Sequence, residues 1–163
     1  MLSIRTILHP TDFSERSEYA FHAACALARD YGARLLVLHV GAAPLVGYGV
    51  GVVPPEPERY QEELREKLRK LRVEDPRVQV EHRLIMGGDA AGEILRVAAE
   101  AKGDLIVMGT HGWTGLGRVL MGSVAEQVVR KAACPVLTVR APFSPAEEKP
   151  GVEGAGKTLE VAR

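Results

Sequence analysis

The sequence predicts an α/β fold in which an open parallel β-sheet carries helices on both faces. Three observations lead to this prediction. Short apolar runs alternate with helical periodicities along the chain, which gives five candidate strands and four candidate helices. Each connection is long enough for a right-handed crossover, so consecutive strands can lie parallel. The run Asp104–Met108 is also apolar at nearly every position, which is typical of a strand buried on both faces.

The first half of the chain begins with a strand, a helix and a second strand. Ser3–His9 is the first strand candidate, and it ends at Pro10. Ser14 is placed to cap a helix whose apolar residues recur every three or four positions and which ends at Gly32. Arg34–Val40 is nearly continuous in apolar residues and predicts the second strand.

A segment rich in glycine and proline, Gly41–Pro57, precedes the second helix. Its shortage of polar residues favours a flap over a simple linker. The second helix is charged and solvent-facing, with a narrow apolar stripe that includes Leu64 and Leu68. Arg77–Ile85 then alternates apolar and polar residues, which predicts a half-exposed third strand.

The second half of the chain repeats the alternation of helix and strand. Asp89 is placed to cap the third helix, which Gly103 ends. After the buried fourth strand comes a glycine-rich loop, Gly109–Met121, and then a helix over Ser123–Ala133. The last strand is predicted at Pro135–Arg140, because its residues are apolar and β-branched.

Length and composition indicate one domain, residues 1–140, followed by a polar tail rich in glycine and proline, residues 141–163. Lysine plus arginine and aspartate plus glutamate number 21 each, so charge gives no argument for nucleic acid or an acidic membrane as a partner. No apolar run approaches the ~20 residues that a membrane span needs. The N-terminus shows no basic leader or cleavage site, so we expect a cytoplasmic protein.

A pattern of glycines follows the buried fourth strand. Gly109-x-x-Gly112 is separated by nine residues from Gly122-Ser123, which opens the fourth helix. Glycines let backbone amides approach an anion, and the first amides and dipole of a helix attract negative charge. The same residues also fit a purely structural loop, in which Ser123 and Glu126 form a capping box. The residues alone leave phosphate binding and a structural loop open.

A second phosphate-type pattern lies near the C-terminus, where Gly151–Thr158 satisfies G-x-x-x-x-G-K-[ST]. That motif binds phosphate when a buried strand precedes it and a helix follows. Here a charged stretch with a proline precedes it, and five residues remain after it. We interpret the match as a coincidence of a glycine-rich tail.

Metal and redox sites have little support in the residue pattern. His9 and His39 end adjacent strands, but no third ligand accompanies them, so we expect each to be satisfied within the fold. Cys25 and Cys134 have no neighbour at metal-ligand or redox spacing. We therefore interpret both cysteines as small core residues.

Four separated segments resemble the universal stress protein family. They are His9-Pro-Thr-Asp-Phe-Ser14, the run from Asp104 to Gly112, Gly122-Ser-Val-Ala-Glu126 and Cys134-Pro-Val-Leu-Thr-Val-Arg140. The segments agree with the family in order and spacing, and the similarity covers roughly Ser3 to Arg140. The glycine pattern is complete, which resembles the ATP-binding branch of the family.

The resemblance implies a Rossmann-like sheet of five strands in the order 3-2-1-4-5, with a reversal between strands one and four. Such sheets bind ligands beyond the carboxyl ends of their strands at the reversal. The residues that the resemblance assigns to the nucleotide are Pro10, Thr11, Asp12, Val40, Met108, Gly109, His111, Gly112, Gly122, Ser123 and Val124.

The resemblance places Asp12 at the adenosine end of the ligand. There it is the best candidate to meet either the ribose or a phosphate-bound Mg²⁺ or Mn²⁺, because a hard cation prefers oxygen. Its alternative role is to cap the first helix. His111 either donates to a phosphate or is an exposed loop histidine, and Arg118 either reaches a terminal phosphate or is solvated. Trp113 is expected to pack the loop against the protein or a partner rather than to stack on adenine.

The resemblance implies an ATP-binding regulatory or sensor protein of the stress response. A slow ATP hydrolase or adenylate-transferring enzyme is one alternative, and a nucleotide-free dimeric interaction protein is another. The glycine loop contains no lysine and Asp12 has no second acidic neighbour, so the sequence favours binding without efficient turnover. The resemblance also implies a homodimer through the last strand, Val136–Val139, whose apolar edge invites pairing.

Overall fold

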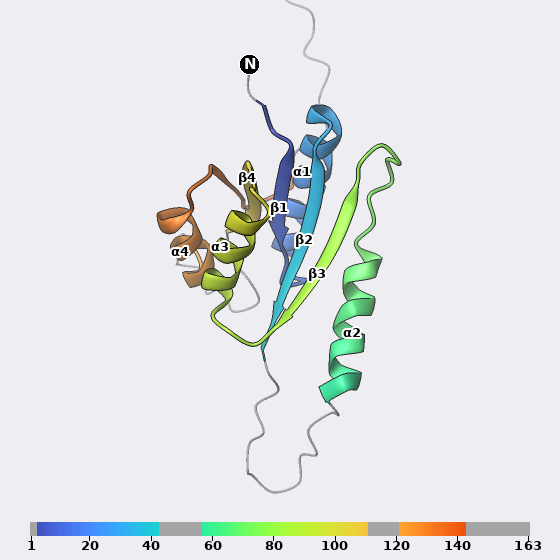
Figure 1. Cartoon of the computed structure of the whole chain (residues 1–163), viewed down its shortest axis with the longest axis vertical. Coiled ribbons are helices and arrows are strands. Elements are labelled where there is room, and N and C mark those ends of the chain that lie inside the picture. Colours follow the sequence, from blue (N-terminus) through green and yellow to red (C-terminus); the bar gives the residue numbers. More distant parts are fainter. Residues whose placement is uncertain (1–2, 43–56, 111–120, 143–163) are drawn as a thin grey trace, which may run out of the picture.

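The structure is a computed structural model that describes residues 3–42, 57–110 and 121–142. Five parallel strands form one sheet in the order β3-β2-β1-β4-β5, and helices flank both of its faces (Figure 1). The predicted fold class and strand order are confirmed. The elements are β1 (Thr6–Pro10), α1 (Glu15–Tyr31), β2 (Arg34–Gly41), α2 (Pro57–Lys70), β3 (Val80–Met86), α3 (Ala90–Glu100), β4 (Leu105–Gly109), α4 (Ser123–Lys131) and β5 (Val136–Val139).

The end of α3 differs from the sequence prediction. The helix ends at Glu100 rather than at Gly103, because Ala101 is its C-cap and Lys102 takes the left-handed conformation, with φ of 50°. The Gly103 N–H still donates to the carbonyl of Ala98 at 2.8 Å. The chain therefore reverses one residue earlier than the glycine predicts, on a residue that rarely adopts this conformation.

Two apolar layers cover the sheet. Alternate residues of a strand point to opposite faces, so Ile7 of β1 joins the layer beneath α1 and α2, and Leu8 joins the layer beneath α3 and α4. Leu68 of α2 is buried in the first layer, and Ile94 and Val128 are buried in the second. Burial of these side chains fixes the helices against the strands. Among the described residues, no helix is long and apolar enough to cross a membrane.

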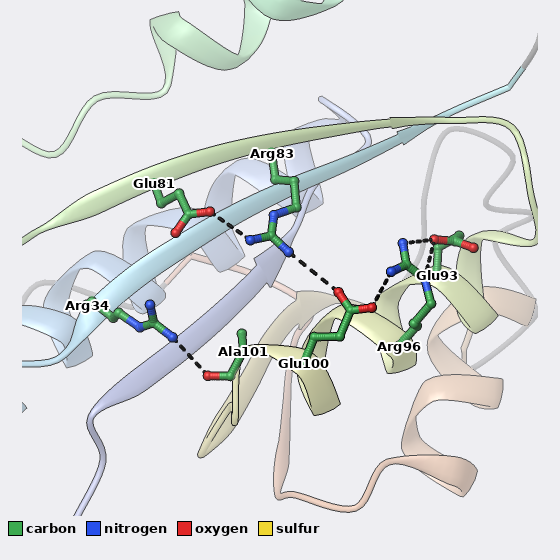
Figure 2. Close-up of polar contacts among 7 residues, drawn as sticks. All are labelled: Arg34, Glu81, Arg83, Glu93, Arg96, Glu100 and Ala101. Carbon is green, nitrogen blue, oxygen red and sulfur yellow. Dashed lines mark hydrogen bonds and ion pairs between the residues drawn. The ribbon is translucent and has the colours of Figure 1, made fainter.

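Charged side chains connect α3 to the edge strand β3 (Figure 2). Arg83 of β3 pairs with Glu81 at 2.9 Å, and its guanidinium lies 3.9 Å from a carboxylate oxygen of Glu100 on α3. Glu100 also pairs with Arg96, which in turn pairs with Glu93 near the start of the helix. The ion pairs form a continuous row along α3, whose amino end reaches the carboxyl edge of the sheet.

Strands β1 and β4 separate toward the carboxyl edge of the sheet. β1 pairs with β2 along its whole length, from Thr6 to Pro10, but with β4 only at Ile7 and Leu8. Pro10 has no backbone N–H with which to continue the ladder. The separation falls where the strand order reverses, which is the position at which open α/β sheets bind ligands.

Candidate functional site

A pocket of about 260 Å³ lies at the carboxyl ends of β1, β2 and β4. Every predicted site residue that the structure describes lines this pocket. His111 and Gly112 lie outside the described residues, as do Trp113, Arg118, residues 43–56 of the predicted flap and Gly151–Thr158 of the tail. The pocket is lined by Pro10, Thr11, Asp12, Ser17, Leu38, Val40, Ala90, Ile94, Met108, Gly109, Thr110, Gly122, Ser123, Val124 and Ala125.

Thr11 is held in place by several hydrogen bonds. Its N–H donates to the carbonyl of Leu38 on β2 at 2.8 Å. Its hydroxyl oxygen accepts from the Ser17 hydroxyl at 2.8 Å and from the Phe13 N–H at 3.1 Å. Ser17 is buried in the first turn of α1 and also lines the pocket. Sequence reasoning missed Ser17, because a helix residue six positions from Thr11 carries no local signal of this contact.

Asp12 does not cap α1, so the capping interpretation of this residue is wrong. The N-cap is Ser14, as predicted, and its side chain accepts from the Ser17 N–H. Asp12 instead supports the cap, because one carboxylate oxygen accepts from the Ser14 N–H at 3.0 Å and from the Ser14 hydroxyl at 2.6 Å. The carboxylate is half-buried at the edge of the pocket.

The amino end of α4 forms another side of the pocket. Its N-cap is Gly122, which has no side chain to accept a hydrogen bond, so the predicted Ser123–Glu126 capping box is wrong. The Gly122 N–H donates to the carbonyl of Thr110 at 2.7 Å. The next three amides, of Ser123, Val124 and Ala125, precede the first amide that bonds within the helix, at Glu126. These residues therefore bring helix amides and the positive end of the α4 dipole to the pocket.

Gly109 is the last residue of β4 and lies against the first turn of α1. A Cβ atom at this position would lie 3.1 Å from the backbone carbonyl of Arg16 and 3.2 Å from the backbone nitrogen of Ser17. A glycine directly after a buried strand is typical of a sharp turn of the chain. The structure gives a different reason, which is the close approach of two backbones.

The wall opposite the polar loop is apolar. Leu38 and Val40 come from β2, Met108 from β4, and Ala90 and Ile94 from the amino half of α3. Sequence reasoning predicted Val40 and Met108 but did not include Ile94, an apolar residue of the third helix, in the site. Its position in the helix could have indicated this role, because a helix that follows a parallel strand begins at the carboxyl edge of the sheet. A residue near its start can therefore contact a ligand there.

Two histidines flank the polar loop, and each bonds a backbone carbonyl through Nδ1, whereas the buried Nε2 of His9 has no hydrogen-bond partner among the described residues. His9 is fully buried, and its Nδ1 lies 2.8 Å from the carbonyl oxygen of Val107. The Nδ1 of His39 lies 2.7 Å from the carbonyl oxygen of Thr11. Because a carbonyl only accepts, the proton of each neutral ring sits on Nδ1. Burial lowers the pKa of His9 to about 4, and it lowers the pKa of His39 as well.

Residues 3–140 match the family model described as the universal stress protein family. The chain belongs to this family. A universal stress protein of Methanocaldococcus jannaschii, MJ0531, is 39% identical to the chain over 147 residues, which are 85% of this chain and 83% of the relative. The match therefore spans most of both chains.

Solved structures show the same fold. The protein MJ0577 of the same organism superposes with a TM-score of 0.71 and 29% identity, over 88% of this chain and 100% of that chain. A universal stress protein from Archaeoglobus fulgidus, solved in complex with dAMP, has a TM-score of 0.58 and 24% identity over 86% of this chain and 100% of that chain. These structures thus share the fold over 88% and 86% of this chain.

Proposed function

We propose that this chain binds ATP in the pocket between β1 and β4 and acts as a regulatory or sensor protein. The observation that carries the proposal is the composition of the pocket. Its lining combines an apolar wall with a polar end that is formed by the first amides of α4 and the loop after β1. An adenine nucleotide has the same division between an apolar base and anionic phosphates.

The phosphates are assigned to the amino end of α4. The amides of Ser123, Val124 and Ala125 lack partners within the helix, and the helix dipole favours negative charge at this end. A glycine N-cap leaves room for an anion at a point where a serine or aspartate side chain would otherwise accept from these amides. The reversal of strand order supports the assignment, because it opens the crevice beside this helix.

The adenine base is assigned to the apolar wall. Leu38, Val40, Ile94 and Met108 present aliphatic side chains there, and planar bases are well accommodated between such groups. The dAMP complex of the Archaeoglobus fulgidus protein supports the choice of adenine. In this assignment the apolar wall holds the base and the amides of α4 hold the phosphates.

A divalent cation, Mg²⁺ or Mn²⁺, is proposed to accompany the phosphates. Proteins commonly hold Mg²⁺ with one or two carboxylates, and the substrate phosphates and water complete the shell. Asp12 fits this role, because its side chain supplies carboxylate oxygens at the lining of the pocket, and a hard cation prefers oxygen ligands. When bound, the cation would neutralise phosphate charge beside Asp12.

Binding with slow or no turnover is proposed over efficient catalysis. Phosphoryl transfer needs a positioned nucleophile and cationic groups at the transferring phosphate. Among the lining residues that the structure describes, Asp12 is the sole ionisable side chain. A measured ATP turnover approaching the ~1–10³ s⁻¹ of ordinary enzymes would favour the alternative, a hydrolase of the same fold.

The test is a Gly122→Val variant, titrated with ATP and Mg²⁺ by calorimetry. Gly122 has φ of −70° and ψ of 155°, an extended conformation that valine adopts readily, so we expect the fold to persist. The added side chain would block the amides of α4, and we expect the dissociation constant to rise about 100-fold or more. Lys131→Val, at the exposed far end of the same helix, is the matched control and should bind as the wild type does. Equal affinity of Gly122→Val and wild type would refute the assigned site.

A further inference from the structure

The segment between β1 and α1 is held in an unusual backbone conformation. Phe13 has φ of 62°, a left-handed value that non-glycine residues with bulky side chains rarely adopt. Such conformations persist when surrounding contacts determine them, and they cluster at functional sites. Phe13 directly follows Asp12, so contacts that hold Phe13 restrain the backbone that carries the Asp12 carboxylate.

His39, at the end of β2, contacts the residues on both sides of Asp12. Its Nδ1 donates to the carbonyl of Thr11 over 2.7 Å. Its ring packs on the ring of Phe13, with centroids 4.4 Å apart and an interplanar angle of 39°. The Lys67 ammonium of α2 lies 5.8 Å from the centroid of the Phe13 ring, within the range of a cation–π interaction.

The other anchor of Asp12 lies on α1. Its carboxylate accepts two hydrogen bonds from Ser14, which caps that helix. The aspartate is thus fixed from α1 through Ser14 and from β2 through His39. His39 itself does not line the pocket. The described contacts of the His39 side chain reach the pocket through Thr11 and Phe13, the two neighbours of Asp12.

We propose that His39 is a positioning residue of the nucleotide site, which sets the place at which Asp12 presents its carboxylate to the metal-bound phosphates. The inference rests on the proposed function. It assigns His39 a role in ligand affinity and not only in stability. The imidazole acts as a fixed hydrogen-bond donor and as a flat surface for Phe13.

The test uses three substitutions that treat the donor differently. His39→Asn keeps an amide donor near the place of Nδ1, His39→Gln moves the same amide one methylene farther, and His39→Leu removes the donor. Each full-length variant is titrated with ATP, with Mg²⁺ and with chelator in place of the metal, and its thermal unfolding is recorded. We expect His39→Gln and His39→Leu to bind Mg²⁺–ATP roughly fivefold more weakly than wild type, the scale of one net hydrogen bond. His39→Asn should remain close to wild type.

Two further comparisons separate positioning from general destabilisation. With chelator, all three variants should bind ATP as wild type does, because the carboxylate then has no cation to hold. In an Asp12→Asn background, His39→Leu should cause no further loss of Mg²⁺–ATP affinity. Unchanged affinity in both His39→Gln and His39→Leu, or the same loss in the Asp12→Asn background, would overturn the inference. Failure of the wild type to bind ATP at all would overturn the proposed function, and the inference with it.

Discussion

A hydrogen bond from the His9 side chain takes the place of a backbone hydrogen bond between β1 and β4. The ladder between β1 and β4 stops at Leu8, and Pro10 has no N–H to extend it. The His9 ring donates instead to the carbonyl of Val107, so the strands separate without leaving that carbonyl unpaired. The other ring nitrogen, Nε2, is buried and has no hydrogen-bond partner among the described residues. Protonation at Nε2 would therefore place an uncompensated charge in the core.

This arrangement predicts a loss of stability in acid. The pKa of His9 falls from 6.5 to about 4 on folding, because burial disfavours the charged ring. Between these two values the unfolded chain holds a proton that the folded chain does not, so stability decreases as pH falls through this window. At pH 4 the loss amounts to roughly 3 kcal/mol at 1.36 kcal/mol per pKa unit, and it is complete only below the folded-state pKa.

Urea unfolding of wild type and His9→Asn, at pH 7 and near pH 4, measures the loss of stability that His9 causes. Asparagine can donate to the Val107 carbonyl but does not titrate. The wild type should lose about 3 kcal/mol more than the variant over this interval. Carboxylate titration affects both proteins alike and cancels in the difference. Parallel losses in the two proteins would show that His9 does not titrate in this way.

Individual residues also show what the sequence could and could not predict. The Gly122-Ser123 start of α4 was predictable, because a glycine before a helical periodicity is a local signal. The role of Gly109 was not predictable, because it depends on the approach of the Arg16 backbone from another element. Ser17 was missed for the same reason, since its contact with Thr11 exists once α1 has packed.

At the scale of elements, α3 connects the pocket to the edge strand β3. Its amino half supplies Ala90 and Ile94 to the apolar wall, and its far end is joined to β2 and β3 by arginines (Figure 2). Arg34 of β2 donates to the carbonyl of Ala101 at 2.9 Å, and Arg83 of β3 faces Glu100. The helix is thus fixed at both ends, by burial near the pocket and by charge near its C-terminus.

The ion pairs predict a small and salt-sensitive contribution to stability. Arg83→Gln removes both the pair with Glu81 and the contact with Glu100 on the helix; the Arg83 side chain is 36% exposed and each glutamate side chain is 50% exposed. Partly exposed pairs are worth about 0–1 kcal/mol and are screened by salt. Urea unfolding at low ionic strength should show a loss within that range, and the loss should shrink in high salt. Arg59→Gln, which removes a pair within α2, is the control and should cost less. A loss for Arg83→Gln that salt leaves unchanged would mean that packing, and not charge, is responsible.

The sequence predicted the type and order of the nine elements from periodicity, because each has a local pattern of apolar residues. It could not supply the pairing of the strands, because pairing depends on contacts between distant segments. The strand order came from the resemblance to a family and not from the residues. The end of α3 was missed because Lys102 takes a conformation that the pattern assigns to Gly103.

At the scale of the whole molecule, β5 occupies one edge of the sheet. The carbonyl of Pro135 accepts a hydrogen bond from the N–H of Ile106 in β4, and the carbonyl of Val139 accepts one from the N–H of Thr110, directly after β4. Parallel strands direct alternate residues toward alternate neighbours, so the N–H of Thr138 points away from β4. An apolar strand with outward amides is suited to pairing with another chain. We therefore retain the homodimer through Val136–Val139 as a prediction.

A proline at the edge tests the dimer. Thr138→Pro removes the outward amide and leaves the bonds to β4 intact, because those belong to the residues on either side. Sedimentation of the wild type should show a dimer, and the variant should sediment as a monomer at the same concentration. Thr138→Val keeps the amide and is the matched control. A wild type that is monomeric at all accessible concentrations would contradict the prediction.

The central claim is that the phosphates of a nucleotide bind at the amino end of α4. The most direct test compares the amide resonances of the ¹⁵N-labelled protein on addition of ATP with Mg²⁺ and on addition of adenosine. ATP should shift the amides of Ser123, Val124 and Ala125 strongly, because phosphate oxygens accept from them. Adenosine, which lacks phosphates, should perturb the residues around Val40 and Met108 and leave the α4 amides nearly unmoved. Saturation with ATP that leaves those three amides unshifted would contradict the account.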